Sequence, residues 1–176
     1  YNLMESIPYD KRSGKIWFNG QTVDWNQANI HVLNHGLHYA SCVFEGERVY
    51  DGEIFKLEEH THRLFYSADR MGIKVPFSED EINKACKHIV NIQKVKNGYV
   101  RPVIWRGSEM MAISAQKNKI HVAIATWEWG SYFDPKLKIE GIKLNISKWR
   151  RPAPDTIPWD TKAAGLYMIC TLSKHE

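Results

Sequence analysis

A single lysine stands among small and apolar residues near the C-terminal end of the sequence. Lys162 precedes Ala163-Ala164-Gly165, and an apolar run begins at Leu166. Such neighbours predict a poorly solvated amine, which is nucleophilic and suits Schiff-base chemistry with an aldehyde cofactor. The small residues let a flat ring approach the backbone, and Tyr167 offers a phenol to a cofactor oxygen. On spacing alone, an ordinary surface lysine is the competing interpretation.

Arginine and tyrosine side chains elsewhere in the sequence are suited to anions. Arg63 lies in a helical pattern, and its planar fork of donors suits a phosphate, although an exposed arginine paired with Glu59 explains the same pattern. Tyr99 and Arg101 alternate with Val100, so in a strand their side chains point to the same face. A phenol beside a guanidinium predicts a site for a carboxylate.

Histidines cluster just before the middle of the N-terminal half. His31, His35 and His38 recur at nearly helical spacing, a pattern that metal sites also use. Asn34 and Gly36 argue against a regular helix here, and no cysteine or carboxylate completes a set of ligands. We therefore expect hydrogen-bonded or partly buried histidines and no metal.

Two hairpins and a helix are the first elements expected to position these residues. Residues 15–25 carry Asn19-Gly20 between apolar flanks, and residues 47–57 carry Asp51-Gly52 in the same way. Each segment predicts a hairpin closed by a tight turn that needs positive φ. Apolar residues at helical spacing then predict a helix over residues 57–71.

A second helix has the clearest start signal in the sequence. Ser78 and Glu81 form a capping box, in which each side chain satisfies a free backbone N–H of the first turn. Gly98 is expected to end this helix. The buried stripe is expected to consist of Ile82, Ala85, Ile89 and Ile92.

Strand-like segments follow this helix. Residues 98–107 and 119–129 are rich in β-branched and aromatic residues and predict two strands. Pro102 has no N–H to donate, so the first of these strands is expected at a sheet edge or a bulge. After a linker, a further strand is expected over residues 141–149 and a helix over residues 166–174. Hairpins and helices followed by strands predict an α+β fold rather than a doubly wound sheet.

The composition is that of a globular protein. The chain has 176 residues, 43% of them apolar, and a formal net charge of +4, so it can bury a core. Its basic residues are scattered, which does not favour a nucleic-acid partner. Cys42, Cys86 and Cys170 lie far apart, and we expect small buried thiols in a cytoplasmic protein. We expect neither a membrane span nor a signal peptide.

Motifs spread over nearly the whole chain resemble those of one enzyme family. They are IWFNGQTVDW, HVLNHGLHYASCVFEGER, EEHTHRL, YVRP, WEWGSYF and WRRPAPDTIPWDTKAAGLY. Together they resemble the N-terminal half of fold-type IV pyridoxal phosphate enzymes, closest to the bacterial branched-chain amino acid aminotransferases. The resemblance implies a class IV aminotransferase-like α+β fold. It divides into a small α/β domain over residues 1–126, an interdomain loop over 127–139, and the start of a larger pseudo-barrel domain over 140–176.

The resemblance also implies roles for the residues that carry chemistry. Lys162 matches the lysine that forms the Schiff base with pyridoxal 5'-phosphate and then moves the Cα proton. Arg63 matches the arginine that holds the cofactor phosphate, and Tyr167 the tyrosine that hydrogen-bonds the phenolic oxygen. The implied reaction moves the amino group of leucine, isoleucine or valine to 2-oxoglutarate, as in branched-chain amino acid biosynthesis.

A substrate pocket is implied in the same way. Tyr99 would help to bind the α-carboxylate, and Arg101 would receive the side-chain carboxylate of glutamate. The remaining pocket residues would be Phe44, Gly46, Arg48, Trp129 and Tyr132, with Tyr39, Met111 and Ile113 reaching in from a second subunit. The protein is therefore expected to self-associate as a dimer or a larger homo-oligomer.

Two departures from the family pattern stand out. Glu47 places a carboxylate where many members are apolar, and Ala40 stands where glycine is common. The second half of the family fold, which pairs an acid with the pyridine nitrogen, is absent from these residues, so a fragment that is inactive alone is expected. The alternatives are a D-amino acid aminotransferase, an aminodeoxychorismate lyase, or a non-catalytic dimerisation or binding module.

Overall fold

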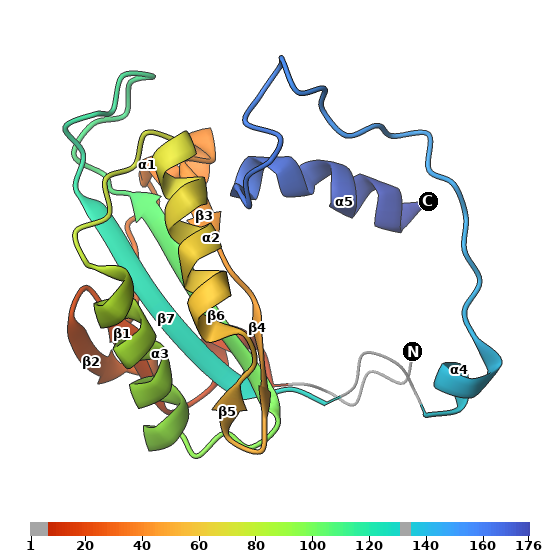
Figure 1. Cartoon of the computed structure of the whole chain (residues 1–176). Helices are drawn as coiled ribbons and strands as arrows, with labels where there is room; N and C mark the ends of the chain where they lie inside the picture. The colour runs from red at the N-terminus through yellow and green to blue at the C-terminus, as the bar shows by residue number, and fades with distance from the viewer. Residues whose placement is uncertain (1–6, 131–134) are drawn as a thin grey trace.

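An antiparallel sheet of seven strands is built from the first three quarters of the chain, and the C-terminal segment with α4 (Pro135–Glu140) and α5 (Tyr167–His175) lies to one side of it (Figure 1). The sheet is seen in a computed structural model that describes residues 7–130 and 135–176. The strands follow the order β2-β1-β7-β6-β4-β5, and β3 also pairs with β6. All the pairings named here are antiparallel, in agreement with the α+β prediction. The strands are β1 (Lys15–Phe18), β2 (Gln21–Asp24), β3 (Cys42–Phe44), β4 (Glu47–Tyr50), β5 (Glu53–Ile54), β6 (Gly98–Arg106) and β7 (Ile120–Glu128).

Both predicted hairpins are confirmed. Asn19 and Gly20 connect β1 to β2 with φ angles of 50° and 92°, and Asp51 and Gly52 connect β4 to β5 with φ angles of 50° and 86°. Positive φ at two consecutive positions matches the twist of the flanking strands, and these residue types tolerate it best. The turns therefore fix the register of both strand pairs.

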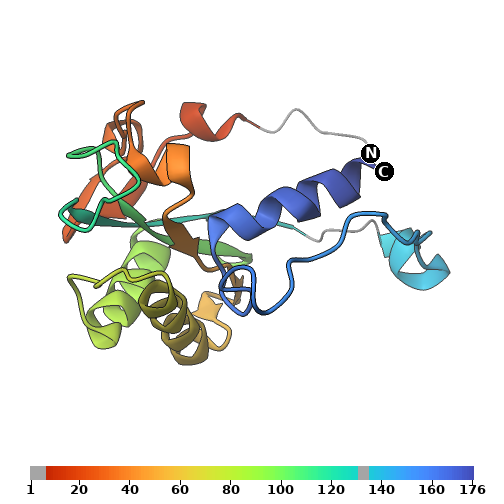
Figure 2. The same ribbon diagram turned by 90° about the horizontal axis from the view of Figure 1, so that it is seen from above.

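Two helices cover one face of the sheet. α2 (Leu57–Arg70) and α3 (Glu79–Ile92) lie side by side on one side of the strands, whereas α1 (His35–Tyr39) lies on the other side (Figure 2). α3 begins as predicted. The Ser78 hydroxyl accepts from the Glu81 N–H at 3.2 Å, and the Glu81 carboxylate accepts from the Ser78 N–H at 2.7 Å.

Two details of the α3 prediction are wrong. Ile92 is 41% exposed, whereas Val90 is buried. The buried positions follow the i, i+3, i+4, i+7, i+8 pattern from Ile82, and Ile92 falls outside it. Gly98 does not end the helix, because the chain already turns at Lys94, where φ is 54°. Gly98 is instead the first residue of β6.

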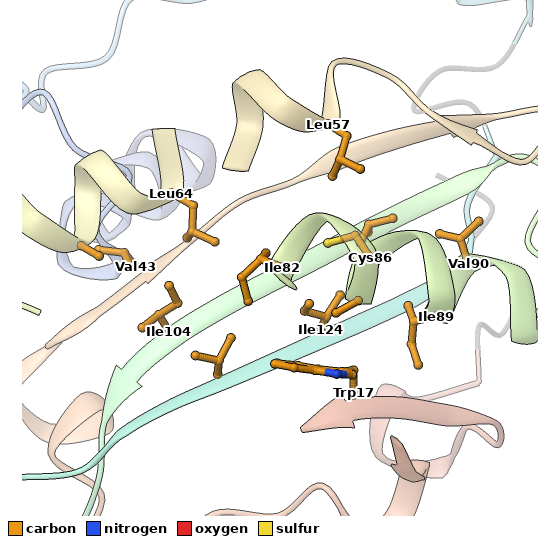
Figure 3. Packing of buried hydrophobic residues seen from close by; sticks show 14 of the residues in the cluster. Trp17, Val43, Leu57, Leu64, Ile82, Cys86, Ile89, Val90, Ile104 and Ile124 are labelled. Atoms are coloured by element: carbon orange, nitrogen blue, oxygen red, sulfur yellow. The ribbon is translucent and has the colours of Figure 1, made fainter. Parts of the chain in front are cut away.

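Apolar side chains from the two helices and the sheet make one core (Figure 3). Leu64 of α2 and Ile82 of α3 are fully buried, as are Val43, Ile104 and Ile124 of the strands. Burial of such side chains is the main favourable contribution to folding. The helix-covered face therefore contains most of the apolar core, whereas the opposite face, called the open face below, is covered only in part, by α1.

The expectation that Pro102 lies at a sheet edge or a bulge is wrong, because β6 lies inside the sheet and its registers with β7, β3 and β4 contain no inserted residue. β7 pairs with one side of β6, and β3 and β4 pair with the other. Phe44 pairs with Val103 and Glu47 with Val100, so the same register places Glu45 opposite Pro102. The Glu45 N–H donates to the Pro102 carbonyl at 2.9 Å, but Pro102 has no N–H to return. The proline therefore interrupts the ladder between β3 and β4 without forming an edge.

The C-terminal part of the chain contains helices but no strand in its described residues. α4 (Pro135–Glu140) is followed by an extended segment, the short 3-10 turn η3 (Ala164–Leu166) and α5 (Tyr167–His175), so the predicted last helix is confirmed. The strand expected over residues 141–149 is absent. Its alternating apolar residues Ile142, Leu144 and Ile146 are exposed, and no strand in the described part of the chain pairs with them. A strand forms only where a partner satisfies its backbone.

Two further findings concern the chain as a whole. None of the helices in the described ranges combines the length and apolar character needed to cross a bilayer.

The three cysteines are free thiols, but only Cys86 is buried as expected. Cys42 is partly buried, and Cys170 is exposed on α5 because that helix buries no face in this structure.

Candidate active site

The peptide group of Lys162 is held from two sides. Its N–H donates to the Ser67 hydroxyl of α2 at 3.0 Å, and its carbonyl accepts from the Phe44 N–H at the end of β3 at 3.2 Å. The next residue, Ala163, forms an antiparallel bridge with Val43. Lys162 is therefore fixed between the helix layer and the sheet, although both lie far from it in sequence.

The amine of Lys162 meets a phenol and an aromatic ring. Nζ donates to the Tyr167 hydroxyl at 2.6 Å. The centroid of the Phe44 ring lies 4.9 Å from Nζ and 4.8 Å from the centroid of the Tyr167 ring. The phenol can exchange a proton with the amine, while the aromatic neighbours displace water from it. The structure thus brings together the lysine and the tyrosine that the sequence singled out.

A second cationic group reaches the same Phe44 ring from β6. The Arg101 guanidinium lies 4.5 Å from the Phe44 centroid, and its Nη2 donates to the Tyr99 hydroxyl at 3.2 Å. Val100 is fully buried on the helix side, so Tyr99 and Arg101 share the open face, as their alternation predicts. Arg101 Nε is buried without a hydrogen-bond partner among the described residues. The Arg101 guanidinium is therefore not fully paired within the described residues.

Gly46 and Trp129 shape the space around Tyr99. A Cβ at Gly46 would collide with the Tyr99 phenol, so only glycine lets that ring lie against the strand. The Trp129 ring packs at 4.8 Å from the Tyr99 ring, centroid to centroid, and extends the aromatic wall. Arg48 pairs with Tyr99 across β4 and β6, and so lies at the same end of the site. Tyr132 lies outside the described residues.

Arg63 forms an ion pair with a buried carboxylate. Its Nε and Nη2 donate to the two carboxylate oxygens of Glu45 at 2.5 and 2.8 Å. His60 Nδ1 lies 2.9 Å from one of these oxygens. The Glu45 side chain is 0% exposed, whereas that of Arg63 is 52% exposed. Glu59, the alternative partner considered for Arg63, pairs with Lys56 instead.

The ion pair changes the pKa of both partners. Burial alone would raise the pKa of Glu45, but hydrogen bonds from Arg63 and His60, with the charge of Arg63, lower it overall. The hydrogen bond to Glu45 raises the pKa of Arg63, and the nearby Tyr167 adds to that rise. Arg63 also lies one helical turn before Ser67, whose hydroxyl accepts from the Lys162 N–H, so α2 connects Arg63 to the Lys162 backbone.

Glu47 is buried without any such partner. Its side chain is 0% exposed, and neither carboxylate oxygen has a hydrogen-bond partner among the described residues. Burial, with the like charge of Glu45, raises the pKa of Glu47 to about 8. The carboxyl group is therefore a neutral acid at pH 7. It lies on the helix-covered face, so this departure from the family pattern does not reach the open face directly.

Tyr39, Met111 and Ile113 form a separate group. The Tyr39 hydroxyl donates to the Met111 carbonyl at 3.1 Å, and its ring stacks on His35 at 4.5 Å. Ile113 is 88% exposed. In the described ranges, no ring contact or hydrogen bond joins these residues to Lys162. Their contribution across a subunit boundary remains a prediction.

The histidines take part in hydrogen bonds, as predicted. His35 is buried, with Nδ1 2.7 Å from the Ser41 hydroxyl, and His38 Nε2 lies 2.9 Å from a backbone carbonyl. The expectation of no regular helix is wrong for the five residues of α1, because the Asn34 side chain accepts from the Gly36 N–H and caps it. No cluster of three His, Cys, Asp or Glu in the described residues could hold a metal ion.

Sequence reasoning missed the residues that support the site from behind: Glu45, His60 and Ser67. A signal for Glu45 was present, because Glu45 and Glu47 alternate in step with the apolar Val43 and Val49. A carboxylate on the buried face of a strand requires a partner. Ser67 lies four residues after Arg63, which places both on one face of α2.

Comparison with known proteins assigns this geometry to a family. The family model described as amino-transferase class IV matches residues 42–176, and the chain therefore belongs to the class IV aminotransferases. Over 161 residues it is 43% identical to a Rickettsia conorii protein named "Probable branched-chain-amino-acid aminotransferase". Over 169 residues it is 40% identical to the branched-chain-amino-acid aminotransferase of Pseudomonas aeruginosa.

The matches cover most of this chain but only part of its relatives. The two alignments include 92% and 94% of this chain and 54% and 55% of those proteins, so the chain spans about half the length of the curated relatives it matches. A solved T.th. branched-chain amino acid aminotransferase with pyridoxamine 5'-phosphate superimposes with a TM-score of 0.88 and 34% identity, over 93% of this chain and 55% of that one. The same relative has been solved with N-(5'-phosphopyridoxyl)-L-glutamate and with 4-methylvaleric acid.

Proposed function

We propose that the protein is a pyridoxal phosphate-dependent aminotransferase that moves the amino group of leucine, isoleucine or valine to 2-oxoglutarate. The observation that carries the proposal is the Lys162 amine 2.6 Å from the Tyr167 hydroxyl, beside the Arg101–Tyr99 pair. An amine that acts as nucleophile and then as base needs a neighbour that can exchange a proton with it. The names of the relatives support the same reaction.

The side chains of the site fit pyridoxal 5'-phosphate. This cofactor carries an aldehyde, a phenolic oxygen and a phosphate, and the site offers an amine, a phenol and a half-exposed guanidinium. We assign Lys162 to the aldehyde, Tyr167 to the phenolic oxygen and Arg63 to the phosphate. When bound, the cofactor supplies an electron sink for bond breaking at the amino-acid Cα. Lys162 then holds and moves the Cα proton.

The open face supports one pocket for two kinds of substrate. Arg101 and Tyr99 offer donors to a carboxylate, whereas the rings of Phe44 and Trp129 offer an apolar wall. A relative that binds both a glutamate adduct and 4-methylvaleric acid supports this combination. The proposed pocket also includes Gly46, Arg48 and Tyr132, with Tyr39, Met111 and Ile113 from a second subunit.

The organisation of the protein is part of the proposal. We propose a small domain over residues 1–126, a connecting loop over 127–139 and a second domain that begins at residue 140. Leu144 and Ile146, which are 86% and 88% exposed, support a second domain that covers them.

Location and self-association are also part of the proposal. Free thiols support a cytoplasmic location, and the exposed Tyr39–Ile113 group supports self-association.

A panel of amino donors tests this function. The complete gene product that contains this sequence would be incubated with pyridoxal phosphate, 2-oxoglutarate and one donor at a time, and the glutamate formed would be measured. L-leucine, L-isoleucine and L-valine are expected to react at least about tenfold faster than D-alanine. Transfer from D-alanine but not from L-leucine would instead support a D-amino acid aminotransferase, and no transfer from any donor would contradict an aminotransferase.

A further inference from the structure

Glu45 holds Arg63 along one edge of the guanidinium. Nε and Nη2 donate to the two oxygens of Glu45, and this edge is the one closest to the aliphatic stem. The outer edge, formed by Nη1 and Nη2, still presents two parallel N–H bonds. In the described residues Nη1 makes no hydrogen bond, Nη2 also lies 3.4 Å from His60 Nδ1, and the side chain is 52% exposed. The bidentate ion pair with Glu45 therefore leaves N–H donors on the outer edge of the guanidinium that point away from Glu45.

We propose that Glu45 is a positioning residue for the cofactor phosphate, because it fixes the Arg63 guanidinium with this outer fork free to bind. The inference rests on the proposed function, since it takes Arg63 as the phosphate-binding arginine. Glu45 itself does not contact the phosphate.

The carboxylate of Glu45 is itself well anchored. It is fully buried, His60 Nδ1 lies 2.9 Å from Oε2, and the Gly46 N–H donates to the same oxygen at 3.2 Å. Its own backbone N–H donates to the Pro102 carbonyl of the central strand at 2.9 Å. A long arginine side chain loses much conformational freedom when it binds an anion. A fixed carboxylate removes most of that freedom before the phosphate arrives.

The same helix also sets the distance between the two ends of the cofactor. Ser67 accepts from the Lys162 N–H and lies four residues after Arg63, about 6 Å further along the axis of α2. The residue assigned to the phosphate and the residue assigned to the aldehyde are thus both held against one face of α2. An Arg63 side chain free to rotate would lose this spacing.

The negative charge of Glu45 weakens phosphate binding, whereas its effect on the orientation of Arg63 strengthens it. A carboxylate beside Arg63 neutralises part of its charge and weakens its attraction to a phosphate at longer range. Removal of the carboxylate would therefore strengthen phosphate binding if charge decided the outcome, and weaken it if orientation did. The inference is that orientation decides, because the bidentate pair is short and buried on the Glu45 side.

Paired binding measurements on the complete gene product test this inference. The dissociation constants of pyridoxal 5'-phosphate and of phosphate-free pyridoxal would be measured for wild type, Glu45→Gln and Arg63→Lys. Glu45→Gln is expected to weaken binding of the phosphorylated form by about tenfold and to leave pyridoxal binding unchanged. Glu47→Gln is the control for substitution of a buried glutamate on the same strand segment, because Glu47 makes no hydrogen bond to Arg63, and it should change neither constant.

The outcomes separate the inference from the function on which it rests. If Arg63→Lys reduces the preference for the phosphorylated form but Glu45→Gln does not, Glu45 has no positioning role. Tighter binding in Glu45→Gln would likewise overturn it, since charge would then outweigh orientation. A wild type that does not prefer the phosphorylated form would overturn the assignment of Arg63 itself. Should Glu45→Gln fail to fold, Glu45→Asp, which keeps the charge but is one methylene too short to reach both donors, is expected to show the same selective loss.

Discussion

The two faces of the central sheet carry different kinds of side chain, although the same strands build both. On the face covered by α2 and α3, Val43, Val100 and Ile104 are fully buried. On the open face, Phe44 and Arg101 remain partly exposed and contact each other. Alternation along a strand makes this separation possible. Stability and chemistry are therefore assigned to different residues that are immediate neighbours in sequence.

Residues 45–48 show this separation within four positions. Glu45 and Glu47 face the helices, whereas Gly46 and Arg48 face the open side. The two buried carboxyl groups differ only in their partners: hydrogen bonds lower the pKa of Glu45, and burial raises that of Glu47 to about 8. The helix-covered layer thus accepts a carboxyl group either as a paired ion or as a neutral acid.

The largest expected effect is in the core. Leu64→Ala should lower the free energy of unfolding by about 2–5 kcal/mol, because it opens a cavity beside α2 where Leu64 is 0% exposed. Leu144→Ala is the control, since Leu144 is 86% exposed and its loss should cost less than about 0.5 kcal/mol. Urea unfolding measures both. A large loss of amino transfer in fully folded Leu64→Ala would contradict the assignment of stability to the helix-covered face and of activity to the open face.

Glu47→Leu should stabilise the fold by about 2–4 kcal/mol at pH 8. The folded-state pKa of about 8 lies above the ordinary value of 4.5, so the folded chain holds an extra proton between these values. The contribution of the neutral acid is complete below about pH 4.5, declines as the pH rises and is lost above about pH 8. Urea unfolding from pH 5 to 9 should show this slope in wild type and not in the variant. If the free energy of unfolding changed equally with pH in wild type and Glu47→Leu, Glu47 would not be a neutral acid in the folded protein.

A substitution on the open face should change activity and leave stability nearly constant. Arg101→Met is expected to slow the reaction with glutamate by about 10–100-fold, because a charge-assisted contact to the side-chain carboxylate is lost. The reaction with L-leucine should change less than about threefold, as an apolar side chain does not use this contact. Arg106→Met, on the same strand, is the control. Equal losses with both donors would contradict the role of Arg101.

The smallest effect concerns backbone strain beside the open face. Ala40 has a φ of 53°, a left-handed conformation that costs a residue with a Cβ about 1–2 kcal/mol. Ala40→Gly should therefore raise the free energy of unfolding by about 0.5–1 kcal/mol after the greater chain entropy of glycine is included. Ala163→Gly, at a φ of −79°, should destabilise instead. Thermal unfolding of both variants tests this difference in sign.

Elements with strong local signals could be predicted from the sequence. The Asn19-Gly20 and Asp51-Gly52 turns and the Ser78 capping box depend on residues within a few positions of each other, and all are present. Pro102 was placed wrongly because a proline excludes one hydrogen bond only, and an interior strand can accommodate it between two partner strands. The strand expected over residues 141–149 depends on a distant partner, which no local pattern contains.

The sequence indicated which side chains could carry the chemistry of the site, but not the residues that hold those side chains in place. Type and spacing raised Lys162, Tyr167 and Arg63 only beside surface-residue alternatives, and the family resemblance implied their roles. The structure joins Lys162 to Tyr167 at 2.6 Å. The ion pair between Glu45 and Arg63 joins the sheet to α2, and the hydrogen bond between Ser67 and Lys162 joins positions 95 residues apart. Such contacts follow from the packing of α2 on the sheet, which sequence periodicity alone does not specify.

The most direct test of the central claim is the visible absorbance of the complete gene product with added pyridoxal phosphate, before and after L-leucine. Wild type, Lys162→Ala and the control Lys174→Ala would be compared. We predict a visible band of protein-linked cofactor in wild type and Lys174→Ala that L-leucine converts to a near-ultraviolet band, and no such band in Lys162→Ala. A band of wild-type intensity in Lys162→Ala, or none in wild type, would contradict the role of Lys162.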